Sequence, residues 1–316
     1  MQAAPPQPLL SLAQRAAEIS RKARAANTLR AYASDWADFS SWCAGRSLPS
    51  LPAETETIIL YLTECSSRIK ASTLARRVAT ISQAHQSQGM ESLTHRSAIR
   101  LFLRALRREK AEQGSFERRK RAILGHELRA MLLAIPPSIL GIRDKALLLA
   151  GYLGAFRRSE LVGLDVEDLE VVDFGLIVHL RRSKTDPEGH GEKKGIPKST
   201  EEGVCPVRAL LLWLNTAGIK HGPIFRPVTR SGQICAERLS DRAVARAVKR
   251  YAAAALLDPA QLAGHSLRSG LATAAALAGK SEWAIMQQTG HKSVTTVRRY
   301  IRDGNLFRDN AANDLI

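Results

Sequence analysis

The stretch Phe174–Lys198, which reads FGLIVHLRRSKTDPEGHGEKKGIPK, decides the fold class of this sequence. Residues 174–182 alternate and are rich in β-forming side chains, as in a half-buried strand. Residues 183–195 are full of turn formers, and residues 196–198 supply a return strand. The stretch therefore predicts an antiparallel hairpin with a long, charged tip.

Helical patterns surround this hairpin on both sides. Apolar residues at helical spacing predict a series of helices before and after it, at 125–134, 142–154, a short helix from Ser159, 206–216, 238–254, 266–278, 281–288 and 293–302. Residues 122–316 are therefore expected to form an α+β domain that is mainly α, with a small antiparallel sheet.

Residues 26–112 carry helical patterns and no convincing strand. The first helix has an apolar stripe at spacings of three and four, after Thr28 as the expected N-cap: Leu29, Tyr32, Trp36, Phe39 and Cys43. We interpret the stripe as core, with a base-stacking platform as the alternative. Further helices at 55–68, 72–88 and 95–112 complete a small all-helical domain.

Two segments flank this helical domain. Residues 1–25 are expected to form a flexible arm, because Pro5, Pro6 and Pro8 prevent an early helix. Residues 113–121 have the composition of a linker that ends in a basic run. Such runs are usually solvated, but between two positively charged domains this one would follow a phosphate backbone.

The charge balance points to a polyanionic partner. Lys and Arg total 47 against 30 Asp and Glu, which gives a net charge of +17. Nucleic acid, an acidic membrane surface or an acidic protein all fit this excess. The composition is 45% hydrophobic and 24% charged, which is typical of a globular chain and argues against general disorder.

Other classes of protein are disfavoured. No stretch approaches the ~20 apolar residues of a membrane span, and the first residues lack the apolar core of a signal peptide. The four cysteines are far apart without C-x-x-C spacing, so we expect free thiols in a reducing cytoplasm and no zinc site.

Three groups of basic residues are candidates for contacting DNA. Arg76 and Arg77 lie beside Thr80, Gln83 and Gln86, and a helix with these side chains outward suits the major groove; a solvated face is the alternative. Spacings of three and four place several further arginines on one side of the next helix, namely Arg100, Arg104 and Arg107. The linker contributes the last group, Arg119, Lys120 and Arg121.

Several familiar catalytic motifs are absent from the sequence. It has no Gly-rich phosphate loop, no H-E-x-x-H, no G-x-S-x-G and no acidic cluster of the kind that holds two metal ions. The candidates for chemistry are therefore basic residues, histidines and one tyrosine.

Each candidate also has a structural interpretation when taken alone. Arg157 could form an ion pair with Glu160, three residues later. His265 and Arg268 lie three apart on one face of a turn. His291 follows Gly290 ahead of a predicted helix, where an anion is favoured.

The last two candidates are Tyr300 and Lys184. A tyrosine near a helix end, such as Tyr300, is usually amphipathic core. A lysine in a hairpin tip, such as Lys184, is usually soluble surface.

Taken together, these residues form a recognisable series. The motifs R-x-S-E-L at 157–161, H-x-x-R at 265–268, and Gly290-His291 followed by Tyr300 resemble the tyrosine recombinase (phage integrase) family, including its Xer and Cre branches. The resemblance covers about 122–305. It extends more loosely to the helical domain, which is similar to the core-binding, SAM-like domain of the family.

The resemblance implies a site-specific DNA recombinase that integrates, excises or resolves DNA elements, with no metal ion or other cofactor. Tyr300 would attack the scissile phosphate and form a covalent 3′-phosphotyrosyl link. Arg157 and Arg268 would stabilise the charge on the non-bridging oxygens. Lys184 would protonate the leaving 5′ oxygen.

The resemblance also assigns supporting roles. His265 would be a base or proton relay, because tyrosine, with a pKa of ~10, loses its proton on attack. His291 would bond a phosphate oxygen, and Glu160 would orient its neighbours. Ala155 and Ser269 depart from the residues that many members have at these positions. Lys193 and Lys194 remain rivals to Lys184.

Assembly is implied in the same way. Members of the family act as tetramers on two double-stranded sites with inverted half-sites. The segment 306–316, with Leu306, Phe307 and Leu315, would anchor in a neighbouring subunit or fold back on its own domain. We expect a cytoplasmic, nucleoid-associated protein of bacterial, phage or mobile-element origin. A type IB topoisomerase and a non-cleaving DNA-binding accessory protein are the alternative functions.

Overall fold

The computed structural model describes residues 12, 15, 26–114, 120–181 and 191–304. The predicted arm (residues 12 and 15 apart), Arg119, the hairpin tip with Lys184, and the segment 306–316 lie outside the described residues. The chain forms two compact units that divide between Arg118 and Arg119. Within the described residues, no helix is long and apolar enough to cross a membrane.

The N-terminal unit is all-helical in its described part. It contains α2 (Ala26–Ala44), α3 (Thr55–Ser66), α4 (Ala71–Ser87), a short 3-10 turn (Leu93–His95) and α5 (Ser97–Glu112). Phe39 and Cys43 of the predicted stripe are fully buried, with Tyr61, Leu74 and Ile99 in the same core. The stripe is therefore core in its second half, whereas Leu29 in its first half is 37% exposed.

The C-terminal unit contains the predicted hairpin as part of a three-stranded antiparallel sheet in the order β1-β2-β3. The strands are β1 (Leu169–Val172), β2 (Gly175–Leu180) and β3 (Glu192–Pro197). The return strand begins earlier than its apolar residues indicate, and β1 is an additional strand. Sequence and structure agree on the fold class, a mainly α protein with a small antiparallel sheet.

The sheet buries one face. Leu176, Val178 and Leu180 of β2 are buried, and their partners in the register are Ile196, Lys194 and Glu192. Lys194 is only 2% exposed, so a lysine occupies a position that an aliphatic side chain would normally fill. This lysine at a buried strand position lies beside the candidate site.

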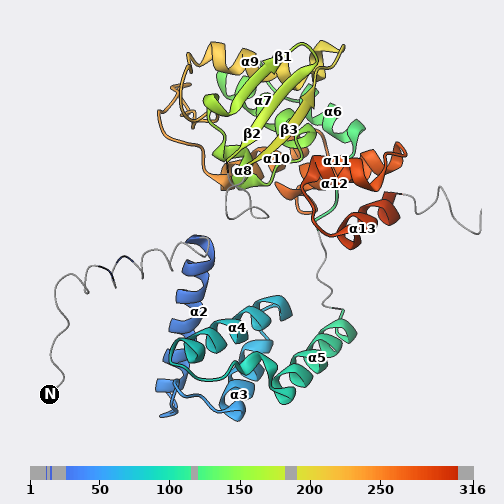
Figure 1. Ribbon diagram of the computed structural model, residues 1–316. Helices are drawn as coiled ribbons and strands as arrows, with labels where there is room; N and C mark the ends of the chain where they lie inside the picture. The colour runs from blue at the N-terminus through green and yellow to red at the C-terminus, as the bar shows by residue number, and fades with distance from the viewer. Residues whose placement is uncertain (1–11, 13–14, 16–25, 115–119, 182–190, 305–316) are drawn as a thin grey trace, which may run out of the picture. The chain divides into compact units, whose positions relative to one another are not determined.

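Eight helices accompany the sheet in the described part of this unit (Figure 1). They are α6 (Gly125–Leu133), α7 (Ile139–Leu153), α8 (Arg158–Gly163), α9 (Pro206–Thr216), α10 (Asp241–Ala254), α11 (His265–Leu277), α12 (Glu282–Thr289) and α13 (Val294–Gly304). Helix α7 packs against both α9 and α11, and β3 contacts both α9 and α12. The strand that returns from the hairpin therefore touches the helix that precedes His291.

Gly270 allows α11 to lie close to its neighbours. A Cβ atom at this position would be 2.2 Å from the Ile123 carbonyl oxygen and 2.7 Å from the Tyr152 ring. Because these atoms leave no room for a side chain, the close approach holds the first turns of α11, with His265 and Arg268, against the core.

Candidate active site

Arg157 and Glu160 form the first part of the site. Arg157 precedes α8, and its backbone N–H donates to Glu160 Oε2 at 2.8 Å while its Nη1 lies 2.5 Å from Oε1. The Glu160 side chain is 3% exposed and the Arg157 side chain 20%. The ion pair considered from the sequence is therefore present, and it fixes an arginine whose side chain still reaches the surface.

Arg268 is the deepest cation of the site. Its side chain is 1% exposed, and Nη1 donates to the Ala155 carbonyl at 2.7 Å and lies 4.0 Å from Glu160 Oε2. Within the described residues its buried Nη2 has no hydrogen-bond partner. Burial and the nearby Arg157 lower the pKa of Arg268 to about 10, which leaves the side chain charged near neutral pH. The site therefore has an unused donor suited to an anion.

Tyr300 and His265 meet across two helices. The Tyr300 hydroxyl in α13 lies 3.4 Å from Nε2 of His265, the first residue of α11. Burial, followed by the charges of Arg268 and Arg157, lowers the pKa of His265. The neutral imidazole is therefore favoured near neutral pH, and a neutral imidazole can accept a proton.

His291 lies in the connection between α12 and α13, just after Gly290 in the left-handed conformation (φ 62°). Its Nδ1 is 2.7 Å from Thr289 Oγ1, and its ring centroid is 5.8 Å from that of Tyr300. Burial, and then the charges of Arg268 and Arg157, lower the pKa of His291 to about 4. The structure thus brings both histidines to the tyrosine.

The described part of the hairpin contains the two rival lysines but not Lys184. Lys193 is exposed, whereas Lys194 is buried and donates to the Gln288 carbonyl at 2.8 Å. Burial and the charge of Arg268 lower the pKa of Lys194 to about 8. Sequence reasoning kept Lys194 only as an alternative acid. The only sequence signal for its burial is the alternation of a strand, which puts Lys194 on the same face as Ile196.

The outward orientation predicted on α4 is wrong for two of its residues. Arg77 Nη1 contacts Asp38 Oδ2 and the Tyr61 hydroxyl at 2.5 Å each, and Thr80 is 3% exposed. Arg76 is partly exposed and pairs with Asp35 at 2.5 Å. The carboxylates of α2 therefore bury most of the Arg77 side chain and pair with Arg76 near the surface.

The linker cations also have partners within their own unit. Lys120 donates to the Ala260 carbonyl, and Arg121 lies 2.6 Å from Glu127 Oε1. The prediction that this run follows a phosphate backbone stays a prediction, and Lys120 remains exposed beside these contacts.

The arginines of α5 follow the predicted arrangement. Ile99 and Leu106 face the core of the helical unit. The basic residues predicted on the other side are exposed: Arg100, Arg104 and Arg107.

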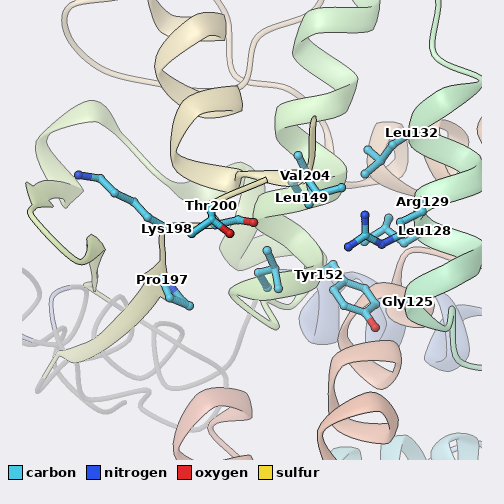
Figure 2. Close-up of a pocket in the computed structure, with 12 residues that line it drawn as sticks. Gly125, Leu128, Arg129, Leu132, Leu149, Tyr152, Pro197, Lys198, Thr200 and Val204 are labelled. Atoms are coloured by element: carbon cyan, nitrogen blue, oxygen red, sulfur yellow. The ribbon is translucent and has the colours of Figure 1, made fainter. Parts of the chain in front are cut away.

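A pocket of about 420 Å³ lies elsewhere in the C-terminal unit. Leu128, Leu132, Leu149 and Arg129 line it, together with residues near the end of β3 (Figure 2). None of its lining residues belongs to the site described above. Among the described residues, no group of three or more His, Cys, Asp or Glu is placed to hold a metal ion.

Comparison with known proteins relates this site to a family. The Phage integrase family matches residues 121–305, and the phage integrase N-terminal SAM-like domain matches residues 18–87. The integrase/recombinase xerD homolog of Selenomonas ruminantium is 46% identical over 297 residues, which are 92% of this chain and 86% of that protein. Recombinase cre of Escherichia phage P1 is 27% identical over 303 residues, 90% of this chain and 86% of that protein.

A solved structure shows the same fold. A lambda integrase tetramer bound to a Holliday junction matches with a TM-score of 0.58 and 20% identity, covering 96% of this chain and 79% of that one. The family match spans the sheet, the helices and every side chain of the site. The chain therefore belongs to the phage integrase family of tyrosine recombinases, enzymes that cleave and rejoin DNA.

Proposed function

We propose that this protein cleaves and rejoins DNA at specific sites by using Tyr300 as the nucleophile. The observation that carries the proposal is the convergence of separate chain segments on one hydroxyl. Tyr300 Oη lies beside His265 Nε2 at 3.4 Å, and its ring lies beside that of His291.

The proposed reaction keeps the energy of the broken phosphodiester bond in a new covalent bond to the enzyme. Tyr300 Oη forms a bond to phosphorus while the bond from phosphorus to the 5′ oxygen breaks, which leaves a 3′-phosphotyrosyl link. The tyrosine proton passes to His265, and the 5′ oxygen takes a proton from Lys184. Attack by a 5′ hydroxyl from another strand reverses these steps and frees Tyr300.

The two arginines and His291 act on the phosphate. Negative charge accumulates on the non-bridging oxygens in the transition state, and fixed cations stabilise it. Glu160 holds Arg157 through two contacts, so that arginine is already oriented before DNA binds. The unpaired Nη2 of Arg268 supplies a further donor.

Assembly is the second part of the proposal. The protein would act as a tetramer on two sites with inverted half-sites, with the segment 306–316 of one copy anchored in another. The leucine-lined pocket at Leu128, Leu132 and Leu149 supports this, because it suits apolar side chains such as Leu306 and Phe307 (Figure 2). We place the enzyme in the cytoplasm of a bacterial host, as part of a mobile element or phage.

The deciding experiment uses a duplex with a nick close to the cleavage site, which traps the covalent complex because the short released fragment with the free 5′ hydroxyl diffuses away. Tyr300→Phe should bind this duplex but form no covalent complex, since it lacks the hydroxyl. Covalent capture by the variant would show that the nucleophile assignment is wrong. Capture by the wild-type protein excludes a non-cleaving accessory protein, and a strand-exchange requirement for matched sites distinguishes a recombinase from a topoisomerase.

A further inference from the structure

Three consecutive backbone carbonyls, beginning at the last residue of α7, each accept a hydrogen bond from a different segment. The Leu153 carbonyl accepts from Gln288 Nε2 at 2.7 Å, and the Gly154 carbonyl accepts from Lys194 Nζ at 3.4 Å. The Ala155 carbonyl accepts from Arg268 Nη1 at 2.7 Å. The turn that leads into Arg157 is therefore bonded by α12, β3 and α11 at once.

Lys194 and Gln288 form a reciprocal connection within this arrangement. Lys194 Nζ donates to the Gln288 carbonyl at 2.8 Å, while the Gln288 side chain donates to the Gly195 carbonyl at 3.1 Å. The Lys194 ammonium also lies 5.4 Å from the centroid of the Phe156 ring. One buried ammonium thus contacts both the segment before Arg157 and the segment before His291.

The electrostatic environment keeps this ammonium in place. Gly154 directly follows α7 and Gln288 lies in the last turn of α12, so the acceptors are at two helix C-termini, where a cation is favoured. Burial and Arg268 lower the pKa of Lys194 to about 8, while Glu160 and Glu192 act in the opposite direction. Near neutral pH the side chain therefore stays mostly charged.

We propose that Lys194 is a positioning residue, which fixes the turn before Arg157 relative to the turn before His291 and does not protonate the leaving group. Its Nζ is directed to two backbone carbonyls inside the protein, and the residue is 2% exposed. This inference rests on the proposed function, because it concerns the placement of side chains around Tyr300. Lys184 then remains the proton donor.

Loss of the connection should slow phosphate chemistry in general. Both carbonyls lie three residues before a side chain that acts on the phosphate, so a shift of either turn moves a group that stabilises the transition state. Misplacement by about 1 Å costs on the order of 10²-fold in rate. A missing general acid has a different effect, because only a poor leaving group needs its proton.

The test compares two nicked duplexes, one with the normal 5′ oxygen at the scissile phosphate and one with sulfur in its place. A thiol has a pKa of about 8.5, far below that of an alcohol, so the sulfur leaves without a proton. Lys194→Met should slow covalent complex formation on both duplexes by a similar factor, about 100-fold. Lys184→Met should slow only the oxygen duplex.

Conservative and control variants sharpen the comparison. Lys194→Arg should recover part of the rate on both duplexes, because a guanidinium can donate to both carbonyls. Lys220→Met replaces an exposed lysine in the loop after α9 and should match the wild-type rates. If Lys194→Met does not fold, Lys194→Arg decides, because a guanidinium can replace the contacts but is too weak an acid to replace a proton donor, and its rates on the two duplexes should fall by the same factor.

Two results would overturn the inference. Recovery of Lys194→Met on the sulfur duplex alone would make Lys194 the general acid, and wild-type rates on both duplexes would leave it without a role. Where Lys194→Met does not fold, a loss of rate in Lys194→Arg that is confined to the oxygen duplex would likewise make Lys194 the general acid. Tyr300→Phe is tested beside them, and covalent capture by that variant would contradict the proposed function instead.

Discussion

Thr289 Oγ1 lies 2.7 Å from Nδ1 of His291 and determines which nitrogen of that ring carries the proton. The threonine hydroxyl donates its own hydrogen to the Ile285 carbonyl at 2.6 Å, so it accepts from His291. Neutral His291 therefore has its proton on Nδ1 and presents Nε2 as an acceptor. A phosphate oxygen is also an acceptor, so His291 must gain a proton to donate to it.

This relationship predicts proton uptake when DNA binds. The pKa of His291 is lowered to about 4 in the free protein, and a phosphate beside the ring should raise it. A group whose pKa rises on binding strengthens binding at low pH, and the gain is lost as the pH rises through the pKa of the complex. The Kd of Tyr300→Phe for duplex DNA should therefore increase as the pH rises above about 4, by at most tenfold per pH unit, and level off above the pKa of the complex.

His291→Gln in the same background is the control, because a glutamine amide donates without titrating. The variant should bind DNA with a flatter pH dependence. An unchanged pH dependence in this variant would show that another group takes up the proton.

The Glu160 carboxylate should be important for stability as well as for orientation. Glu160→Gln removes the carboxylate that pairs with Arg157 and lies 4.0 Å from the buried Arg268, and removal of one partner from a buried pair costs about 3–5 kcal/mol. Urea denaturation should show a loss of this size. Glu282→Gln breaks the exposed pair with Arg298 and should have no measurable effect, so equal losses in the two variants would contradict the interpretation.

The exposed arginines of α5 should contribute to DNA affinity through counterion release. Replacing Arg100, Arg104 and Arg107 by Gln should reduce the slope of log K against log salt by about 0.9 for each phosphate that an arginine no longer neutralises. Titrations of labelled duplex at several salt concentrations measure the slope. Arg46→Gln, at a residue that pairs with Glu64, should keep the wild-type slope. An unchanged slope in the triple variant would exclude this face of α5 from DNA binding.

The sequence pattern predicts part of the sheet but not all of it. Alternation in β2 predicts a half-buried strand, and the structure has one. The return strand begins at Glu192, within residues that look like a turn, because hydrogen bonding to β2 continues although the side chains are charged. Strand β1 has four residues whose burial does not alternate, so no period of two was available to predict it.

The wrong prediction for Arg77 is explained by the carboxylates that the basic residues contact in the folded protein. Arg77 and Arg100 have the same side chain on neighbouring helices, yet Arg77 contacts Asp38 and Tyr61 while Arg100 is exposed. The difference depends on the carboxylates of α2, which lie about 40 residues earlier in the chain. Spacing along one helix contains no information about such distant partners.

The sequence alone determined the mainly helical fold with a small sheet and the residues that resemble a recombinase site, because periodicity and motifs are local properties. Only the tertiary structure decided what each charged group contacts. It buried Lys194 between two helix ends and set the proton of His291 through Thr289, since both depend on atoms brought together from distant segments. The role of a charged group in a folded protein depends on such contacts. Burial strengthens these interactions, and the partners are far apart in the sequence.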